Sequence, residues 1–339
     1  MQSPLHCCCC RCGVADLSGI TLVTGATGFI GRAVALRLAA AGMPVRLAVR
    51  DPANVDLRYA DVVRIANIDA LTDWTEALHG VDAVVHCAAR VHALRDPAKD
   101  PLAAFRAINR DGSARLAEEA ARAGVRRFVF ISTIGVNGAE TTGLPFTPAD
   151  SPRPHSPYAV SKHEAEQALK AIDCSSGLGV VVIRPPLVYG PNAPGNFGTL
   201  LRAMQAGLPL PLGAISNRRA FIFVENLVDL IVQTLSHEAA SGKTLLVSDG
   251  LDISTTRFLQ LVAHAMSRPA RLIPVPGTWV RAALTALGRA DVGQQLCGSL
   301  EIDIEDTKRL LGWEPPTGTQ EALVRATQHF GPGNEGSVT

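Results

Sequence analysis

Tyrosine, lysine and tryptophan are scarce in this sequence: 339 residues contain three Tyr, five Lys and three Trp. No apolar run approaches the roughly 18 residues that a membrane-spanning helix needs, so we expect no membrane span. Lys and Arg total 32 against 31 Asp and Glu, and the net charge of +1 indicates neither a nucleic-acid partner nor an anionic membrane. Without a recognisable signal peptide, the expected location is the cytoplasm.

Cysteine is rare beyond the N-terminus. Five of the eight cysteines lie in the first twelve residues, namely Cys7, Cys8, Cys9, Cys10 and Cys12. Consecutive cysteines point in different directions and lack the paired spacing of zinc ligands. We therefore interpret residues 1–17 as a disordered or mis-assigned leader, with metal or redox binding as the alternative. We assign no metal ligand elsewhere, and the scattered Cys87, Cys174 and Cys297 are expected to be reduced thiols.

From residue 20 onward, short β-branched runs alternate with stretches of helical spacing. The runs are ITLVT (20–24), PVRLAV (44–49), DVVRI (61–65), DAVVHC (82–87), RFVFIS (127–132), GVVVIR (179–184) and TLLVS (244–248). Near-continuous apolar strands between helices predict an α/β, Rossmann-type, doubly wound parallel sheet. We expect a nucleotide-binding domain over 18–184, to which the strand near 244–248 returns. A smaller, mainly substrate-binding C-terminal lobe then covers 185–330, and 331–339 form a tail.

The first strand runs into TGATGFIG, with glycines at 25, 28 and 31. Gly25 permits a tight turn, Gly28 lets backbone amides approach a pyrophosphate, and Gly31 lets the following helix pack closely. The helix then directs its positive end at the phosphates. The strand before the motif and the amphipathic helix after it are the context that this motif requires, so it predicts dinucleotide binding.

The end of the second strand bears on the choice of cofactor. An NAD site usually has Asp or Glu there to bind the ribose 2′-hydroxyl, whereas this chain has Arg50, followed by Asp51. A guanidinium suits the 2′-phosphate of NADP, although it could also stack on the adenine of NAD or be solvated. We expect NADP or NAD, with a preference for NADP. Asn67, after the third strand, either accepts a hydrogen bond from adenine or is a surface turn residue.

The stretch SPYAVSK (156–162) places a rare tyrosine four residues before a rare lysine. Ser156 suits the N-cap and Pro157 the first helical turn, so Tyr158 and Lys162 should share one helix face. An ammonium about 4 Å from the phenol, at an effective dielectric near 20, would favour phenolate by about 4 kcal/mol, or about 3 pKa units. Tyr158 could then act as a general acid and base on a sugar hydroxyl or ketone.

Two further polar positions accompany this pair. FISTIGVNG offers the hydroxyls of Ser132 and Thr133 at the end of the fifth strand, where they could bond a substrate oxygen. Asn109, inside the preceding helix, either holds a relay water or a helix carbonyl or is an ordinary exposed Asn.

TGATGFIG, VVHCAA, STIGVNG, YAVSK and RPPLVYGP together resemble the extended short-chain dehydrogenase/reductase family over about residues 18–330. Within it the chain resembles the nucleotide-sugar 4-epimerases and 4-keto reductases of polysaccharide biosynthesis. The resemblance implies that Tyr158 is the general acid/base, Lys162 its partner, Thr133 the main hydroxyl donor, and Ser132 and Asn109 supports. It implies a cofactor site formed by Gly25, Thr27, Gly28, Phe29, Ile30, Gly31, Arg50, Asn67, Ile68, Ala88, Ala89, Tyr158, Lys162 and Pro185.

On the substrate side the resemblance implies that Arg219 grips the diphosphate of a UDP-sugar, with Asn196, Val91 and Thr133 as further contacts. Leu187 stands where UDP-galactose 4-epimerase has an asparagine, and a second diphosphate-binding arginine is not evident. Family members often dimerise through the helices that carry Asn109 and Tyr158, so a homodimer is expected.

Three functions remain open on these grounds. The protein is a reductase of a UDP-4-keto-6-deoxy sugar, a 4-epimerase of UDP-glucose or UDP-GlcNAc, or a non-catalytic, NADP-sensing regulator of the same fold.

Overall fold

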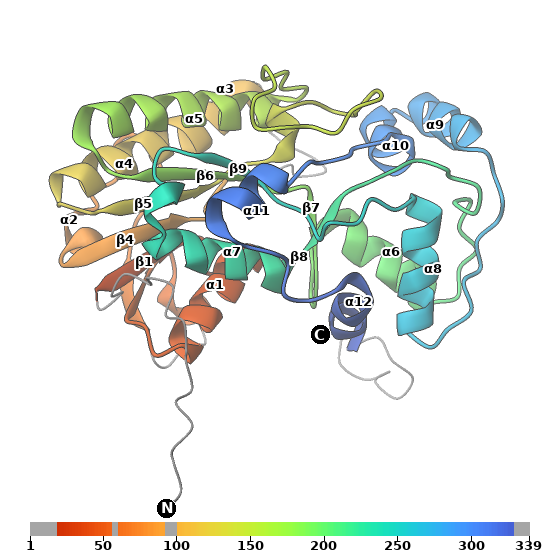
Figure 1. Cartoon of the computed structure of the whole chain (residues 1–339), viewed down its shortest axis with the longest axis horizontal. Coiled ribbons are helices and arrows are strands. Elements are labelled where there is room, and N and C mark those ends of the chain that lie inside the picture. The colour runs from red at the N-terminus through yellow and green to blue at the C-terminus, as the bar shows by residue number, and fades with distance from the viewer. Residues whose placement is uncertain (1–18, 56–59, 92–99, 329–339) are drawn as a thin grey trace, which may run out of the picture.

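A computed structural model of the chain describes residues 19–55, 60–91 and 100–328. Seven strands form one parallel sheet in the order β3-β2-β1-β4-β5-β6-β9 (Figure 1). They are β1 (Ile20–Thr24), β2 (Val45–Val49), β3 (Asp61–Arg64), β4 (Val81–His86), β5 (Arg127–Ile131), β6 (Val180–Arg184) and β9 (Thr244–Leu246). Each falls on one of the predicted runs, and the predicted doubly wound sheet is confirmed.

Helices cover both faces of the sheet because its strands are apolar on both sides. On β1, Val23 belongs to one core and its neighbour Leu22 to the other, since successive strand residues point to opposite faces. The first core includes α1 (Phe29–Ala40) and α7 (Val224–Ser236); the second includes α2 (Thr75–Leu78), α4 (Ser113–Arg122) and α5 (Pro157–Ser176). Figure 1 shows these two helical layers on either side of the strands.

The start and end of α5 follow from local sequence. Ser156 is its N-cap and accepts a hydrogen bond from the Ala159 amide, and Pro157 occupies the first turn, as predicted. Gly177 ends the helix with φ +69°, a left-handed conformation that glycine adopts at little cost. Tyr158 therefore stands in the first turn of a helix whose start is fixed.

The C-terminal lobe lies beside the carboxyl edge of the sheet and forms the right half of Figure 1. It contains the parallel pair β7 (Leu187–Tyr189) and β8 (Phe221–Phe223), with α6 (Gly195–Gln205), α8 (Thr255–Ala265), α9 (Gly277–Ala286), α10 (Ala290–Cys297) and α12 (Thr319–Thr327). Besides β9, helix α7 returns from this half of the chain to the sheet, and α11 (Glu305–Leu311) lies against β9. The boundary after residue 184 stays a prediction.

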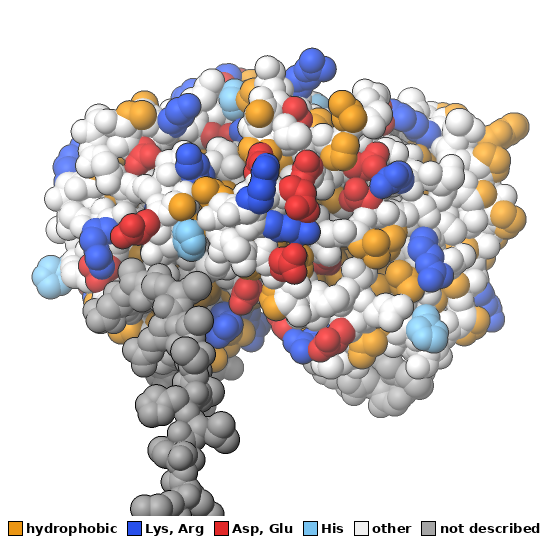
Figure 2. All heavy atoms as spheres, in the orientation of Figure 1, with side chains coloured by type: hydrophobic (Ala, Val, Ile, Leu, Met, Phe, Trp, Pro, Cys, Tyr) orange, Lys and Arg blue, Asp and Glu red, His pale blue; other side chains and the backbone are white. Residues whose placement is uncertain are grey.

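Short helices complete the description: η1 (Pro52–Asn54), α3 (Pro101–Phe105), the π-helix η2 (Arg106–Gly112), η3 (Ile134–Val136) and η4 (Glu238–Ala240). The predicted leader 1–17 and tail 331–339 lie outside the described residues. No helix of the described part is long and apolar enough to cross a membrane. Figure 2 shows acidic and basic side chains interspersed over the middle of the face in view.

The order of the strands positions the site. The chain moves outward from β1 through β2 to β3 and then returns to place β4 on the other side of β1. In open parallel sheets this reversal leaves a crevice at the carboxyl ends of the two central strands, where ligands bind. Here the residues after β1 and β4 are Gly25 and Cys87.

Candidate active site

The glycine loop between β1 and α1 is packed too tightly for side chains. Gly25 has φ +69°, and a Cβ there would lie 2.7 Å from the Ala88 backbone nitrogen. A Cβ on Gly31 would lie 2.3 Å from the Gly25 carbonyl oxygen, and the Gly28 amide donates to the same oxygen at 2.9 Å. The backbones of the turn, of the residues after β4 and of α1 are therefore in close contact, as predicted from the glycines at 25 and 31.

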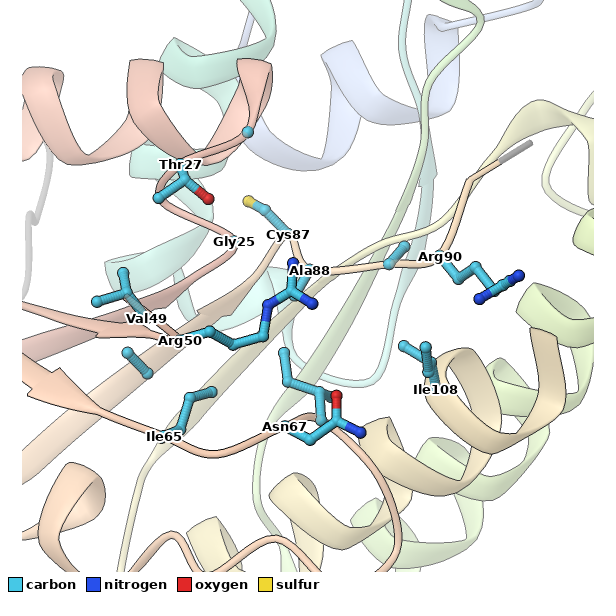
Figure 3. Close-up of a pocket in the computed structure, with 14 residues that line it drawn as sticks. Gly25, Thr27, Val49, Arg50, Ile65, Asn67, Cys87, Ala88, Arg90 and Ile108 are labelled. Carbon is cyan, nitrogen blue, oxygen red and sulfur yellow. The ribbon is translucent and has the colours of Figure 1, made fainter. Parts of the chain in front are cut away.

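A cavity of about 350 Å³ opens beside this loop (Figure 3). Eight of the residues predicted for the cofactor line it: Gly25, Thr27, Gly28, Arg50, Asn67, Ile68, Ala88 and Ala89. Phe29, Ile30 and Gly31 belong to the adjoining first turn of α1. The other lining residues were missed: Ala48, Val49, Ile65, Cys87, Arg90 and Ile108. Most are apolar residues at strand ends, which sequence patterns do not distinguish from core residues.

The charged groups at the end of β2 separate into two roles. Arg50 is exposed and reaches across the cavity from the strand end, with Asn67 on the side of β3 (Figure 3). The Asp51 carboxylate instead accepts bonds from the Ala53 amide at 3.1 Å and the Asn54 side chain at 2.9 Å. The carboxylate nearest to the strand end thus caps η1, and the group facing the cavity is a guanidinium.

Lys162 lies one turn after Tyr158 on α5 and is completely buried. Its Nζ stands 3.8 Å from the centroid of the Phe130 ring and has no hydrogen-bond partner among the described residues. Burial lowers the pKa of Lys162 to about 7, and the Glu166 carboxylate opposes this shift. A buried ammonium without a hydrogen bond is costly, so the position is suited to a ligand oxygen that completes its coordination.

Tyr158 packs edge-on against the Phe105 ring, with centroids 6.1 Å apart. Burial raises the pKa of Tyr158 to about 12. This direction is opposite to the one that we expected from a neighbouring ammonium. The reason is that the phenol end of this half-buried residue is desolvated, which disfavours its charged form.

The two hydroxyls after β5 have different surroundings. Thr133 is half-buried and accepts a bond from the Gly135 amide at 3.2 Å, and Gly135 lies against Ala159 in the first turn of α5. The structure thus brings Thr133 to the helix turn that carries Tyr158. Ser132 faces the other way: it is buried, and its hydroxyl donates to Glu166, which in turn pairs with Arg184. Ser132 is part of this ionic network beneath the site.

Asn109 is fully buried within η2. Its Oδ1 accepts from the Arg90 amide at 2.8 Å, while its Nδ2 donates to the Arg90 carbonyl and to the Ser161 hydroxyl, both at 3.0 Å. The exposed alternative for Asn109 is therefore wrong. The side chain links the backbone of Arg90, which follows β4, to Ser161 on α5, and the relay water stays a prediction.

Sequence reasoning missed a buried polar chain around His86, the last residue of β4. Its Nδ1 lies 2.7 Å from the Thr24 hydroxyl and its Nε2 lies 2.9 Å from the Ser113 hydroxyl. The Ser113 hydroxyl donates its single proton to the Asn109 carbonyl, at 2.6 Å. His86 must therefore donate from Nε2 and accept at Nδ1 from Thr24.

Burial lowers the pKa of His86 to about 3, in keeping with this neutral form. The chain ties the strand before the glycine loop to the helix that holds Asn109. A histidine inside the apolar run DAVVHC was the available signal.

The residues present fit a nicotinamide dinucleotide. The glycine cradle excludes side chains at the place for a pyrophosphate, and the cavity has apolar walls and a guanidinium beside it. The Lys162 Nζ, to which no residue of the described ranges is hydrogen-bonded, has the donors that a ribose requires. Pro185, also predicted, follows β6, and its carbonyl accepts from the Ile134 amide at 3.0 Å. No cluster of three or more His, Cys, Asp or Glu among the described residues could hold a metal ion.

The predicted substrate residues do not line one cavity as the cofactor residues do. Arg219 is buried, its Nη1 donates to the Gly298 carbonyl at 2.9 Å, and burial lowers its pKa to about 10. Val91 is 63% exposed. Asn196 lies in the first turn of α6, and its side chain is outside the described part. Arg281, which was not predicted, pairs with Glu140 at 3.4 Å, and the charge of Glu140 also acts on Arg219.

Known proteins resemble the chain along most of its length. Residues 21–248 match the NAD dependent epimerase/dehydratase family. The chain is 40% identical over 312 residues to UDP-glucose 4-epimerase of Vibrio cholerae, covering 91% of this chain and 94% of that protein. It is 30% identical over 274 residues to ceramide reductase of Caulobacter vibrioides, covering 79% and 78%.

Solved structures share the fold. UDP-N-acetylglucosamine 4-epimerase from Bacillus cereus superimposes with a TM-score of 0.76 at 22% identity, over 92% of this chain and 99% of that one. MoeE5 in complex with UDP-glucose and NAD gives 0.73 at 25% identity, over 91% and 98%. With the glycine cradle and the Tyr158–Lys162 helix in place, the chain belongs to the NAD-dependent epimerase/dehydratase family of extended short-chain dehydrogenases/reductases.

Proposed function

We propose that the protein is a 4-epimerase of a UDP-hexose, either UDP-glucose or UDP-GlcNAc. The observation that carries this proposal is the buried Lys162, one turn from Tyr158 and without a hydrogen-bond partner in the described part of the chain, in a protein 40% identical to a UDP-glucose 4-epimerase along nearly its full length. Such a pair serves proton transfer at a carbon that is oxidised and reduced.

When bound, the nicotinamide ring supplies the hydride acceptor and donor. The protein's own residues move and hold the proton at the C4 oxygen. Tyr158 takes the hydroxyl proton, and Thr133, which accepts from Gly135, keeps its O–H to donate to the same oxygen. After the 4-keto sugar presents its other face, Tyr158 returns the proton. Lys162 would bind the nicotinamide ribose, whose oxygens would supply the hydrogen bonds that its Nζ lacks among the described residues and would favour its charged form; the ammonium would then stabilise the Tyr158 phenolate.

Arg219 is the group that we assign to the diphosphate. A guanidinium has five N–H donors, and one of those of Arg219 donates to the Gly298 carbonyl. The remaining donors suit phosphate oxygens at the border of sheet and lobe. Asn196 and Val91 stay proposed contacts of the sugar or nucleotide.

A second candidate, a 4-keto reductase that uses NADPH, is favoured by the end of β2. Arg50 lines the cavity while Asp51 is engaged by η1. A guanidinium pairs with the 2′-phosphate of NADP, and a reductase must exchange its cofactor in each turnover, which an epimerase avoids. The preference for NADP therefore belongs to this second candidate. For either candidate we also propose a cytoplasmic location, a homodimer and a role in polysaccharide synthesis.

The test begins with the cofactor that the purified protein releases on heating. The epimerase is supported if the protein interconverts UDP-glucose and UDP-galactose, or the HexNAc pair, with no net change of absorbance at 340 nm. Stoichiometric loss of NADPH on a UDP-4-keto-6-deoxy sugar, without interconversion, would replace it by the reductase. A Tyr158→Phe variant that loses turnover yet retains full cellular function would point to the regulatory alternative.

A further inference from the structure

Helix α5 carries a buried carboxylate that the proton transfer proposed above does not use. Glu166 stands one turn after Lys162, as Lys162 stands one turn after Tyr158, so the three side chains follow one face of the helix. Glu166 is 7% exposed and Lys162 is fully buried. A buried carboxylate is costly unless it is paired and hydrogen-bonded, so the contacts of Glu166 indicate what it does.

Glu166 joins three segments that carry residues of the site. Its Oε1 accepts hydrogen bonds from the Ser132 hydroxyl and, at 3.0 Å, from Arg184 Nε. Its Oε2 accepts a hydrogen bond from Nη2 of the same arginine. Ser132 and Arg184 are buried and directly precede Thr133 and Pro185. One carboxylate therefore fixes the end of β5, the end of β6 and α5 relative to one another.

The network around Glu166 extends to the long loop before α5. Arg184 Nη1 donates to Asn137 Oδ1 at 2.9 Å, and Asn137 Nδ2 donates to the Thr147 carbonyl at 3.0 Å. The loop that leads into α5 is thus attached to the carboxylate through two side chains. Besides Arg184, the imidazole of His163 faces Glu166, with its Nδ1 4.0 Å from Oε2.

Glu166 is also the negative charge that acts on Lys162. The other titratable groups around Lys162 are Tyr158, one turn earlier, and His86 and Cys87 at the end of β4. Desolvation raises the pKa of Tyr158 and of Cys87 to about 12 and lowers that of His86 to about 3, so these three are neutral near pH 7. In the described part of the chain, the charge of Glu166 therefore favours the ammonium.

We propose that Glu166 is a positioning residue of the active site, which orients the segments of Thr133 and Tyr158 and supplies the negative charge that keeps Lys162 an ammonium for the nicotinamide ribose. The inference rests on the proposed role of Lys162 and applies to the epimerase and the reductase alike. Without this carboxylate, Lys162 would lose its proton at lower pH, and binding of the ribose would then require proton uptake. A residue that only stabilises the fold would not change this pH dependence.

The experiment measures the dissociation constants of NAD and NADP, in separate titrations of protein stripped of nucleotide, from pH 5 to pH 9. In Glu166→Gln the pKa of Lys162 should fall by about one unit or more. The dissociation constant should therefore rise about ten-fold at pH 8 and equal that of the wild type at pH 5. Glu166→Asp keeps the charge on a shorter side chain and should remain close to the wild type. A purely structural role predicts the opposite order, because glutamine keeps the length of glutamate and aspartate does not.

The matched control is Glu164→Gln. Both carboxylate oxygens of Glu164 bind the Arg106 guanidinium, but Glu164 lies two residues after Lys162 and therefore on another face of α5. Its replacement should leave the pH dependence of binding unchanged. If Glu166→Gln does not fold, Glu166→Gln/Arg184→Gln replaces the buried pair without leaving an unpaired charge. This variant should show the same shift, since Glu166 is the member of the pair that acts on Lys162.

Thermal unfolding of the nucleotide-free protein gives a readout that needs neither cofactor nor turnover. Lys162→Met should raise the melting temperature by about 2 °C more in the Glu166→Gln background than in the wild type at pH 5.5, because the ammonium that methionine removes is then more costly. At pH 9, where folded Lys162 is neutral in both backgrounds, the two increases should be equal.

Two results would overturn the proposal: a wild-type pH dependence of binding in Glu166→Gln, or equal effects of Lys162→Met in the two backgrounds at pH 5.5. A protein that binds neither NAD nor NADP would refute the proposed function instead. The melting temperatures alone would then decide whether Glu166 acts on Lys162.

Discussion

Replacing Lys162 by methionine should stabilise the nucleotide-free protein while abolishing its activity. Lys162 is fully buried, and burial lowers its pKa from 10.5 to about 7. The unfolded chain holds this proton more tightly than the folded protein, so folding carries a free-energy cost wherever the unfolded lysine is protonated, which is below about pH 10.5. With these two pKa values the cost is about 1 kcal/mol at pH 10, about 3 at pH 8 and about 5 at pH 6. Methionine of similar length removes this cost.

The sign of the pH dependence makes the prediction specific. Above the unfolded pKa both states are neutral and the variant gains nothing from the lost charge. As the pH falls through the interval between the unfolded and folded pKa values, the variant should become progressively more stable than the wild type. Below about pH 7 the difference should level off. At roughly 2 °C per kcal/mol for a chain of this size, the melting temperature should rise by about 6 °C at pH 8.

The assay is thermal unfolding from pH 6 to pH 10 of protein stripped of nucleotide. The control is Lys170→Met, on the exposed side of the same helix, for which we expect a small and pH-independent change. A Lys162→Met variant that melts at or below the wild-type temperature at pH 7, or whose advantage does not grow as pH falls, would refute the reasoning. Saturating cofactor should narrow or reverse the difference, because only lysine can bind the ribose.

Three further predictions concern the same site. Tyr158→Phe should lower turnover by about 10²–10⁴-fold and leave the dissociation constant of the cofactor nearly unchanged, measured by titration of the nucleotide; an active variant would exclude Tyr158 as the acid/base. Arg50→Asp should favour NAD over NADP by about 10-fold or more, since it exchanges a charged hydrogen bond for repulsion, with Arg37→Asp on the exposed side of α1 as control; competitive binding of the two nucleotides checks this. His86→Leu removes the acceptor of the buried Thr24 hydroxyl and the donor to the Ser113 hydroxyl, which keeps its bond to the Asn109 carbonyl, and should cost about 1–3 kcal/mol in chemical denaturation, whereas His86→Gln should lose less because it keeps a donor and an acceptor.

The regular part of the fold could be predicted from the sequence because the patterns that specify it are local. Each strand is a short β-branched run, and Gly25 and Gly31 stand where a Cβ would collide with backbone. Ser156 and Pro157 specify the start of α5 by their own chemistry. These features need no knowledge of distant residues, so the parallel sheet, the phosphate loop and the Tyr158–Lys162 helix could all be predicted.

The environment of the side chains could not be predicted from the sequence. Asn109 binds the Arg90 backbone and Ser132 binds Glu166, contacts that no local pattern indicates, and their supporting roles in the reaction stay predictions. His86 was not recognised, because its partners Thr24 and Ser113 lie 62 and 27 residues away. The side chain of Asn196 lies outside the described residues, so its contact with the substrate stays a prediction.

The sequence by itself determined the order of strands and helices, the glycine turn and the presence of a tyrosine and a lysine on one helix face, because each depends on neighbours within a few residues. Only the tertiary structure decided how charged those groups are. Burial, imposed by Phe105, Phe130 and the surrounding strands, raises the pKa of Tyr158 and lowers that of Lys162. Desolvation depends on everything packed around a group, and no local pattern records it.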